Sequence, residues 1–322
     1  MCIRDSVRSD SDNCMGRKCE HFKECFFQNA RREMEKANLL VCNHALFFSD
    51  LALRSRSTDG GPSVGLLPSY QHLVLDEAHN IEDVACEHFG ITLTQPRVNR
   101  LLRTLFQPRR GKGYLSERAL ALADADAVSR AMNLVSDAEM AAREFFDALL
   151  DVWEKDTTRT GRIRGSGIVR NTLTPTMRAL SLHLKTLRET VKSEPDKFEL
   201  NSYAKRAADI ADAAEMLVEQ SIPQAVYWVE AQSSHRRQAG GAAPPRHGPV
   251  AFPRVTMACS PIEAGPILRQ HLFSRDMGIV LTSATLSTRA IRPDELPERA
   301  ETAFAYTMTQ LGCENALTMQ LG

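Results

Sequence analysis

The stretch HLVLDEAHNIEDVA, residues 72–85, joins an apolar strand to a pair of acids. The run LVL has the composition of a buried parallel strand, and Asp76 and Glu77 follow it directly. Open α/β sheets bind ligands at the carboxyl edge of such strands. Two adjacent carboxylates there suit nucleotide hydrolysis, with Asp76 holding Mg²⁺ and Glu77 activating a water. Alternatively, the acids cap the helix that follows.

Further strands are expected towards the C-terminus. MGIVLTSATLS, residues 277–287, predicts a strand that ends in a turn rich in hydroxyl side chains. VYWVE, residues 226–230, and VTMACSPI before EAGPILRQHLF predict two more strands and a helix. These are the elements of an α/β fold.

A long helical tract interrupts the strands. It begins near Pro96, a residue typical of a helix start, and extends to about Gln220. Two apolar stripes within it have steps of three and four residues and are separated by SEPDKFE, residues 193–199. We expect an antiparallel helical hairpin in which these stripes form the core: Met177, Leu180, Leu184, Leu187 and Val191 on one helix, and Tyr203, Ala207, Ile210, Ala214 and Leu217 on the other.

Three cysteines lie close together in NCMGRKCEHFKEC, residues 13–25. Their spacing, C-x4-C-x5-C, is looser than the C-x2-C pairs of most zinc sites and favours an iron–sulfur cluster over zinc. A cluster normally needs four thiolates. Cys2 is the one earlier cysteine, and Cys42 lies in LLVC, which we interpret as a buried strand with a core thiol. A helix over residues 28–38 follows the cysteines.

The composition excludes several classes of protein. Among 322 residues, 40 Lys and Arg balance 40 Asp and Glu, so no global field attracts nucleic acid or anionic lipid. Residues 97–118 nevertheless carry seven basic side chains and one acid, Glu117. No apolar run approaches the ~20 residues of a membrane span. The N-terminus lacks the pattern of a secretory signal, so the eight cysteines suit a reducing cytoplasm.

Several of these phrases together resemble a known family. V-L-D-E-A-H-N, residues 74–80, resembles motif II of the superfamily two helicases, and L-T-S-A-T-L, residues 281–286, resembles their motif III. A cysteine group before the DEAH box, and helices between it and SAT, are the layout of the iron–sulfur helicases of the XPD/DinG family, bacterial DinG/YoaA type. N-H-A-L at 43–46 and SPIEAGPILRQHLF at 260–273 are further matches, so the resemblance covers roughly residues 13–287.

The resemblance implies an ATP-dependent helicase that moves 5′ to 3′ on single-stranded or forked DNA, in repair or replication stress. It implies a RecA-like parallel-sheet motor domain, a [4Fe–4S] insertion and an all-helical arch insertion. The roles that it implies are cluster ligation by Cys14, Cys19 and Cys25, Mg²⁺ binding and hydrolysis by Asp76 and Glu77, and coupling of nucleotide state to DNA by His79, Ser283 and Thr285. Basic residues among the cysteines, Arg17, Lys18 and Lys23, are expected to contact phosphates.

The resemblance also predicts domain boundaries. We expect a disordered or artefactual terminus at 1–12, part of the iron–sulfur domain at 13–38, the motor domain with the DEAH box at 39–95, the arch at 96–225, a return to the motor domain at 226–290, and the start of a link to a second motor domain at 291–322. The phosphate loop G-x-x-x-x-G-K-[ST] does not occur in this sequence, because Gly111 and Lys112 lack the rest of the pattern. We therefore expect a central fragment whose fourth cluster thiol lies in a missing part.

Two other interpretations stay open from the sequence. In one, the chain is a metal-stabilised nucleic-acid-binding module without motor activity. In the other, the cysteines hold structural zinc in a regulatory protein, and the DEAH acids cap a helix. Protein partners are not indicated by any motif.

Overall fold

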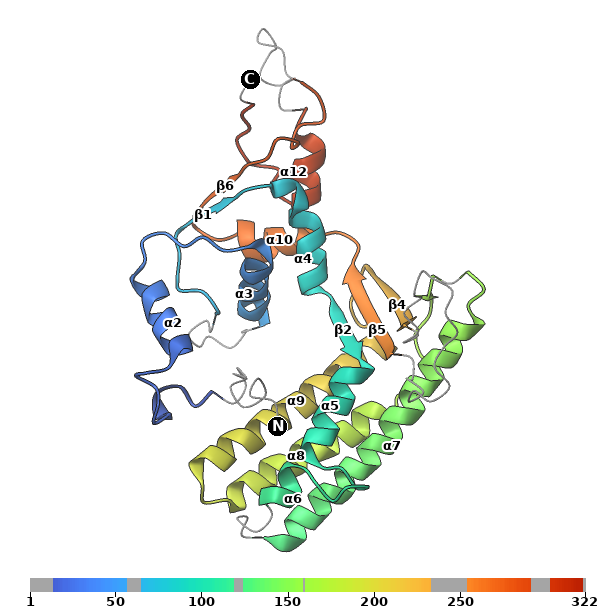
Figure 1. Cartoon of the computed structure of the whole chain (residues 1–322). Coiled ribbons are helices and arrows are strands. Elements are labelled where there is room, and N and C mark those ends of the chain that lie inside the picture. The colour runs from blue at the N-terminus through green and yellow to red at the C-terminus, as the bar shows by residue number, and fades with distance from the viewer. Residues whose placement is uncertain are drawn as a thin grey trace, which may run out of the picture. The chain divides into compact units, whose positions relative to one another are not determined.

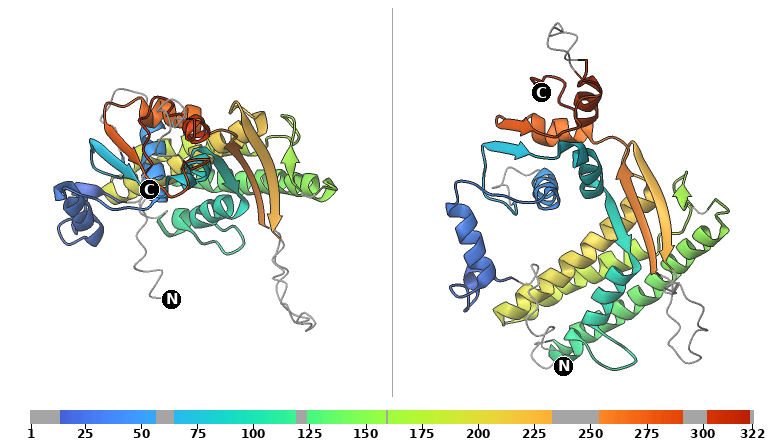
Figure 2. Two further views of the ribbon diagram at one scale, coloured as in Figure 1. Left: turned by 90° about the horizontal axis from the view of Figure 1, so that it is seen from above. Right: turned by 45° about the horizontal axis from the view of Figure 1, so that its top comes forward.

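The computed structural model describes residues 14–56, 65–118, 124–158, 160–232, 254–290 and 302–320 (Figures 1 and 2). The chain forms two compact units, each with its own hydrophobic core. Unit 1 comprises Met1–Phe22 and Ile91–Cys259, and unit 2 comprises Lys23–Gly90 and Ser260–Gly322. Most of unit 1 is therefore inserted into the sequence of unit 2. No helix in the described parts of the chain has both the length and the apolar character that a membrane crossing requires.

Unit 2 contains both of the strands that were predicted beside the DEAH and SAT phrases, and they form a parallel pair. β1 (His72–Leu75) pairs with β6 (Gly278–Leu281) in register from His72 opposite Gly278 to Leu75 opposite Leu281. Figure 1 shows the two strands side by side. The other elements of unit 2 are α2 (Phe26–Lys36), α3 (His44–Arg56), η3 (Ala78–Asn80), α4 (Ile81–Phe89), α10 (Gly265–Leu268), the π-helical turn η5 (Arg269–Phe273) and α12 (Ala305–Leu311). The helices expected after the cysteines and after the acids are confirmed.

The core of unit 2 depends on α3. Asn43 begins this helix, because its side chain accepts a hydrogen bond of 2.9 Å from the amide of Leu46. The helix buries the apolar side chains of Phe47, Phe48 and Leu51 completely or almost completely. These pack with Leu75 of β1, Ile81 of α4 and Leu268 of α10 in one cluster. The strand that precedes the DEAH acids is thus held by a shared apolar core.

A buried ion pair fixes the chain beyond α3. Nε of Arg54 lies 2.7 Å from a carboxylate oxygen of Asp50, whose side chain is completely buried. The other carboxylate oxygen of Asp50 accepts a hydrogen bond of 2.9 Å from the amide of Leu67. The guanidinium of Arg54 also donates to the carbonyls of Leu67 and Pro68, at 2.6 and 3.2 Å. These hydrogen bonds offset the desolvation cost of burying the two charged groups.

The prediction of a buried strand at LLVC is wrong. Residues 39–43 have no regular structure, and Leu39 and Val41 are 80% and 93% exposed. Cys42 is exposed rather than a core thiol. An apolar run becomes a strand only when a neighbouring strand pairs with it. Within the described residues, β1 and β6 pair with each other alone, so this segment has no strand beside it.

Unit 1 contains a second sheet, with the strand order β2-β5-β4-β3. The strands are β2 (Ile91–Thr94), β5 (Arg254–Pro261), β4 (Ala225–Gln232) and β3 (Arg162–Ile163). β2 and β5 are antiparallel, with Ile91 opposite Cys259. The sequence placed 226–290 with the motor domain, but strand pairing places β4 and most of β5 in the helical unit. The reason is β2, a short strand that the sequence did not predict.

The helices of unit 1 are η2 (Gly16–Lys18), α5 (Gln95–Leu105), α6 (Tyr114–Arg118), α7 (Ala125–Lys155), α8 (Leu173–Thr190) and α9 (Glu194–Glu219). Thr94 caps α5 by accepting a hydrogen bond from the amide of Arg97, and Pro96 lies in its first turn. Ser193 caps α9 in the same way. The expected helical tract is therefore confirmed, but the break between its last two helices lies at residues 191–193, and residues 194–199 of SEPDKFE form the first turns of α9.

The predicted hairpin is formed by α8 and α9. The leucines and Met177 of the α8 stripe are completely buried, and Val191 just after the helix is 3% exposed. On α9, Tyr203 is 4% exposed and Ile210 is 1% exposed, and the alanines and Leu217 of the stripe are completely buried. Both stripes belong to one core cluster. The alternating steps of three and four residues therefore identified the packed faces of both helices.

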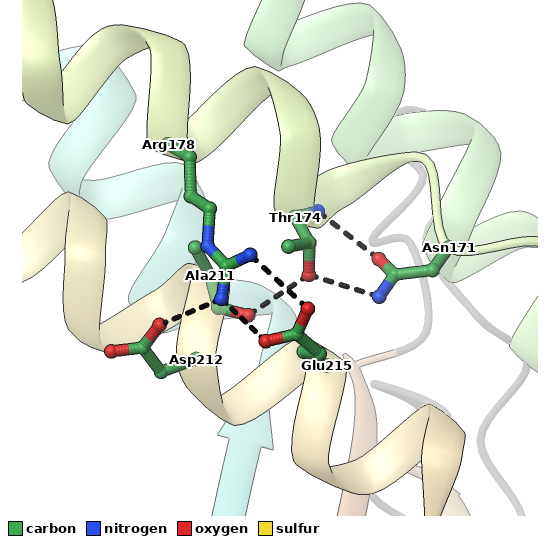
Figure 3. A network of polar contacts seen from close by, with 6 residues as sticks. All are labelled: Asn171, Thr174, Arg178, Ala211, Asp212 and Glu215. Atoms are coloured by element: carbon green, nitrogen blue, oxygen red, sulfur yellow. Dashed lines mark hydrogen bonds and ion pairs between the residues drawn. The ribbon is translucent and has the colours of Figure 1, made fainter.

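Polar contacts join α8 and α9 beside the apolar stripes (Figure 3). The buried hydroxyl of Thr174 donates to the carbonyl of Ala211 at 2.9 Å, and that of Ser181 donates to the carbonyl of Ala204 at 2.7 Å. At the surface, Arg178 forms ion pairs with Asp212 and Glu215. Partners whose numbers rise on one helix as they fall on the other show that the helices are antiparallel.

Candidate functional site

The DEAH acids lie on a tight turn directly after β1. Glu77 adopts a left-handed conformation, with φ 50° and ψ 45°, and its carbonyl accepts a hydrogen bond of 3.0 Å from the amide of Asn80. This backbone conformation is unusual for a residue other than glycine. It reverses the chain from the strand into η3 and leaves Asp76 and Glu77 exposed. Asn80, rather than either acid, is the N-cap residue of α4.

The SAT segment meets this turn at the same edge of the sheet. The amide of Thr282 donates to the carbonyl of Leu75, and the amide of Ala78 donates to the carbonyl of Thr282, both at 2.9 Å. Main-chain hydrogen bonds therefore continue the β1–β6 pairing past the ends of the strands. The two phrases, about two hundred residues apart in sequence, lie in direct contact.

The side chain of Asp76 is held by this contact. Oγ1 of Thr282 donates a hydrogen bond of 2.7 Å to Oδ1 of Asp76. This bond, a main-chain hydrogen bond from Glu77 and the nearby His44 lower the pKa of Asp76 from its usual value. Asp76 is therefore a carboxylate at neutral pH, and its side chain is exposed.

His79 lies between the second acid and the SAT turn. Its Nδ1 lies 2.9 Å from Oγ of Ser283 and 3.3 Å from a carboxylate oxygen of Glu77. Oγ of Ser283 also accepts a hydrogen bond of 3.3 Å from the amide of Thr285. Nδ1 of His79 thus contacts both Glu77 and Ser283, and Ser283 in turn contacts Thr285. The structure brings all five residues predicted for hydrolysis and coupling together.

The arrangement suits a hydrated divalent cation. No group of three or more His, Cys, Asp or Glu side chains in the described part of the chain is placed to hold a metal by itself. Mg²⁺ does not need such a group, because it is commonly bound by one or two carboxylates together with water and substrate phosphates. An ionised, exposed Asp76 fits this pattern.

The three clustered cysteines are placed differently. Cys14 is exposed and Cys19 half-exposed, both in unit 1, and Cys25 is half-exposed in unit 2. The described residues contain no disulfide involving them. Thiols are the donors that an iron–sulfur cluster needs, but they are not gathered here as a ligand group, and Cys2 lies outside the described residues.

The basic residues among the cysteines are exposed, but Lys18 is engaged. Its Nζ lies 3.4 Å from a carboxylate oxygen of Glu194 in the first turn of α9, and 5.4 Å from the ring centre of Phe198. Part of its charge is therefore compensated within unit 1. Arg17 is exposed on η2 and Lys23 is exposed on the turn before α2.

Two residues of the site were missed from the sequence. Thr282 supplies the hydroxyl that donates a hydrogen bond to Asp76, although only Ser283 and Thr285 of this turn were predicted as site residues. The signal was present, because the residue directly after a parallel strand faces the residue directly after its neighbour. His44 acts on the pKa of Asp76 from the start of α3. Only the N-H-A-L phrase pointed to it.

Known proteins share this part of the chain. Residues 2–98 match the DEAD_2 family. A protein of Haemophilus influenzae named ATP-dependent DNA helicase YoaA is 32% identical over 103 residues, which is 32% of this chain and 15% of that protein. The N-terminal third of the chain is therefore similar to DinG-like helicases. The Salmonella typhimurium protein named ATP-dependent DNA helicase DinG is 38% identical over 81 residues, and the Escherichia coli YoaA is 31% identical over 99 residues.

The DinG-like match covers the N-terminal third of the chain, including the cysteines and the DEAH turn. The aligned stretch spans only 15% of the YoaA proteins and 10% of the DinG protein. The predicted resemblance to DinG and YoaA helicases is confirmed over this third of the chain. The mixed α/β structure with a parallel strand pair is consistent with part of a RecA-like helicase domain.

Proposed function

We propose that this chain belongs to an ATP-dependent DNA helicase of the DinG type and carries its hydrolysis and coupling residues. The observation that supports this most is the contact of the DEAH and SAT turns through Asp76–Thr282 and His79–Ser283. The relatives that share the N-terminal third are named ATP-dependent DNA helicases. A helix cap would not require either contact.

In this proposal, Asp76 would hold Mg²⁺, which would supply positive charge to stabilise the transferred phosphate. Glu77 orients the attacking water and accepts its proton. A protonated Glu77 no longer attracts the Nδ1 proton of His79, so the hydrogen bond from His79 to Ser283 changes with each turnover. Ser283 and Thr285 pass this change to the DNA-binding surface. The hydrogen bond from Thr282 keeps Asp76 ionised throughout.

The complete protein supplies the remaining parts. The nucleotide phosphates are held by a phosphate loop outside these 322 residues, and a second motor domain follows the SAT segment. The enzyme acts in the cytoplasm and moves 5′ to 3′ on single-stranded or forked DNA during repair or replication stress. The helices of unit 1 form the arch, and Arg17, Lys18 and Lys23 contact phosphates.

Cys14, Cys19 and Cys25 are proposed as three ligands of a [4Fe–4S] cluster, with a fourth thiolate from a region outside the described residues. The support is their spacing and exposure and the relationship to the DinG-like proteins. When bound, the cluster braces the segment that carries it. Iron analysis of the longer protein, purified without oxygen, tests this assignment: a colourless, iron-free and active helicase contradicts it.

The hydrolysis roles are tested in a longer protein that includes the phosphate loop. Glu77→Gln is expected to lower DNA-stimulated ATP turnover by about 10²- to 10⁴-fold, since a general base contributes about that much. Glu87→Gln, which neutralises an exposed acid of α4, is the matched control and should retain turnover. Unchanged turnover in Glu77→Gln would remove the proposed role. DNA binding without any ATP turnover would favour the metal-stabilised binding module instead.

A further inference from the structure

A pocket of about 410 Å³ lies in unit 1, away from the DEAH turn in sequence. It is lined by the end of α5, the turn that follows and one side of α9. The side chains that matter are Arg103, Arg110, Lys112, Tyr114, Glu199 and Tyr203. Three cations thus face one carboxylate. The proposed function uses none of these residues.

The backbone builds the basic side of this pocket. Gln107 and Lys112 form an isolated antiparallel bridge, with the amide of Gln107 donating to the carbonyl of Lys112 at 2.7 Å. Gly113 follows with φ 136°, and a Cβ there would lie 2.6 Å from the carbonyl oxygen of Leu105. The turn is therefore pressed against the end of α5, which keeps Arg110 and Lys112 on the same pocket as Arg103.

The cations of the pocket are not compensated by acids. No ion pair joins Arg103, Arg110 or Lys112 to a carboxylate in the part of the chain that the structure describes. Elsewhere in unit 1, Arg143, Arg178, Arg188 and Lys197 each have a carboxylate partner. The carboxylate of the pocket, Glu199, already accepts a hydrogen bond of 2.9 Å from the hydroxyl of Tyr203. The pocket therefore has excess positive charge.

The basic surface continues along α5. Arg97 and Arg100 precede Arg103 at three-residue intervals, and all three side chains are exposed. Each interval advances about 4.5 Å along a helix. The opposite side of α5 is anchored by Val98, Leu101, Leu102 and Leu105, which are all buried. A rigid row of cations thus leads to the pocket.

The aromatic residues of the pocket point to contact with a backbone rather than with bases. Tyr114 and Tyr203 are 7% and 4% exposed, and their rings pack against each other at 5.2 Å with a tilt of 58°. Rings used for stacking on bases must offer an open face. Arginine and lysine at a pocket without such a face recognise phosphate oxygens instead.

We infer that this pocket and the arginines of α5 bind the phosphodiester backbone of single-stranded nucleic acid without sequence preference. The inference rests on the proposed function for the choice of nucleic acid, but not on ATP hydrolysis. Arg103, Arg110 and Lys112 act as phosphate contacts, and Glu199 weakens the affinity because it is the acid nearest to them in the pocket.

The test uses the 322-residue chain and fluorescence anisotropy of a labelled oligo-dT at several salt concentrations, without ATP. The double variant Arg103→Gln/Lys112→Gln is expected to weaken binding about 10- to 100-fold at low salt. The slope of log K against log salt should fall by about 1.4, since each single-strand phosphate contact contributes ~0.7. Arg130→Gln/Lys185→Gln, which removes exposed cations of α7 and α8 outside the pocket, is the matched control.

A variant that is expected to strengthen binding separates phosphate contact from a purely structural role of the pocket. Glu199→Gln keeps an acceptor for the hydroxyl of Tyr203 and removes the negative charge, so it should strengthen binding several-fold. Equal affinities for the pocket double variant and the control, or no gain in Glu199→Gln, would overturn the inference. Orthophosphate titrated at constant ionic strength distinguishes a free anion. If it saturates the pocket while oligo-dT binding is unaffected by the pocket variants, the inference is also wrong.

The two proposals fail independently. If Glu77→Gln has no effect on ATP turnover in the longer protein, the anisotropy measurements are unaffected, because they involve no nucleotide. If the pocket variants bind DNA normally, the DEAH chemistry is unaffected.

Discussion

The buried hydroxyls between α8 and α9 allow a quantitative test of the hairpin. Ser181→Ala removes the donor of the 2.7 Å hydrogen bond to the carbonyl of Ala204 without altering the apolar stripe. A carbonyl inside a helix has a second lone pair for its intrahelical partner, so no buried group is left without a hydrogen bond. The cost is then the net value of one hydrogen bond, about 1 kcal/mol.

Two comparisons calibrate this value. Thr174→Ala removes the bond to Ala211, two turns along the helix, and also the acceptor of a 2.9 Å hydrogen bond from Nδ2 of Asn171, so it should cost more than Ser181→Ala. The costs of the two variants should add because the sites share no partner. Leu184→Ala empties part of the completely buried stripe and should cost about 2–5 kcal/mol. For a unit of this size, each kcal/mol lowers the melting temperature by about 2–4 °C.

The assay is urea unfolding followed by tryptophan fluorescence. The chain has 2 tryptophans, Trp153 and Trp228, and both lie in unit 1, so the signal reports that unit alone. We expect the loss of unfolding free energy to increase from Ser181→Ala to the double variant and then to Leu184→Ala. A cost for Ser181→Ala within about 0.3 kcal/mol of zero, or above that of Leu184→Ala, would refute the reasoning.

Three further outcomes are expected. Asp50→Ala should lower the free energy of unfolding of unit 2 by about 3–5 kcal/mol, because it leaves Arg54 buried without its partner; amide hydrogen exchange of unit 2 measures this. Gly113→Ala should destabilise unit 1 by about 1–3 kcal/mol in the fluorescence assay, because φ 136° and a 2.6 Å contact oppose a Cβ. In Thr282→Val, the pKa of Asp76 should rise towards its usual value in a carboxyl NMR titration. The hydrogen bond favours the ionised form of Asp76, so its contribution to stability is present above the unfolded pKa and is lost as the pH falls through the folded pKa. An unchanged pKa of Asp76 in Thr282→Val would contradict this.

Sequence patterns predicted those parts of the fold that depend on local periodicity. The stripes of α8 and α9 and the strand endings at Asp76 and Ser283 required only the alternation of apolar and polar residues. The resemblance implied a parallel sheet, but the pairing of β1 with β6 was not predicted. The helix α3 was missed although Asn43, a good N-cap residue, precedes it. The apolar run before Asn43 predicted a strand instead.

What the sequence could not provide was the choice of partners. LLVC resembles a strand, but it is exposed because no strand pairs with it among the described residues. β4 was predicted as a strand, yet its sheet depends on β2, more than a hundred residues earlier. The basic pocket needs α9 beside the turn after α5, and no local pattern reveals that contact. Long-range pairing is decided by the whole chain rather than by a window of residues.

The pairing of Ile91 with Cys259 has an evolutionary consequence. The chain enters and leaves the inserted unit at two residues that face each other across one antiparallel ladder, about 5 Å apart. A domain whose two ends adjoin in this way can be gained, lost or exchanged without distorting the domain into which it is inserted. Proteins that share the DEAH turn are therefore free to differ in the helices that they carry between these two positions.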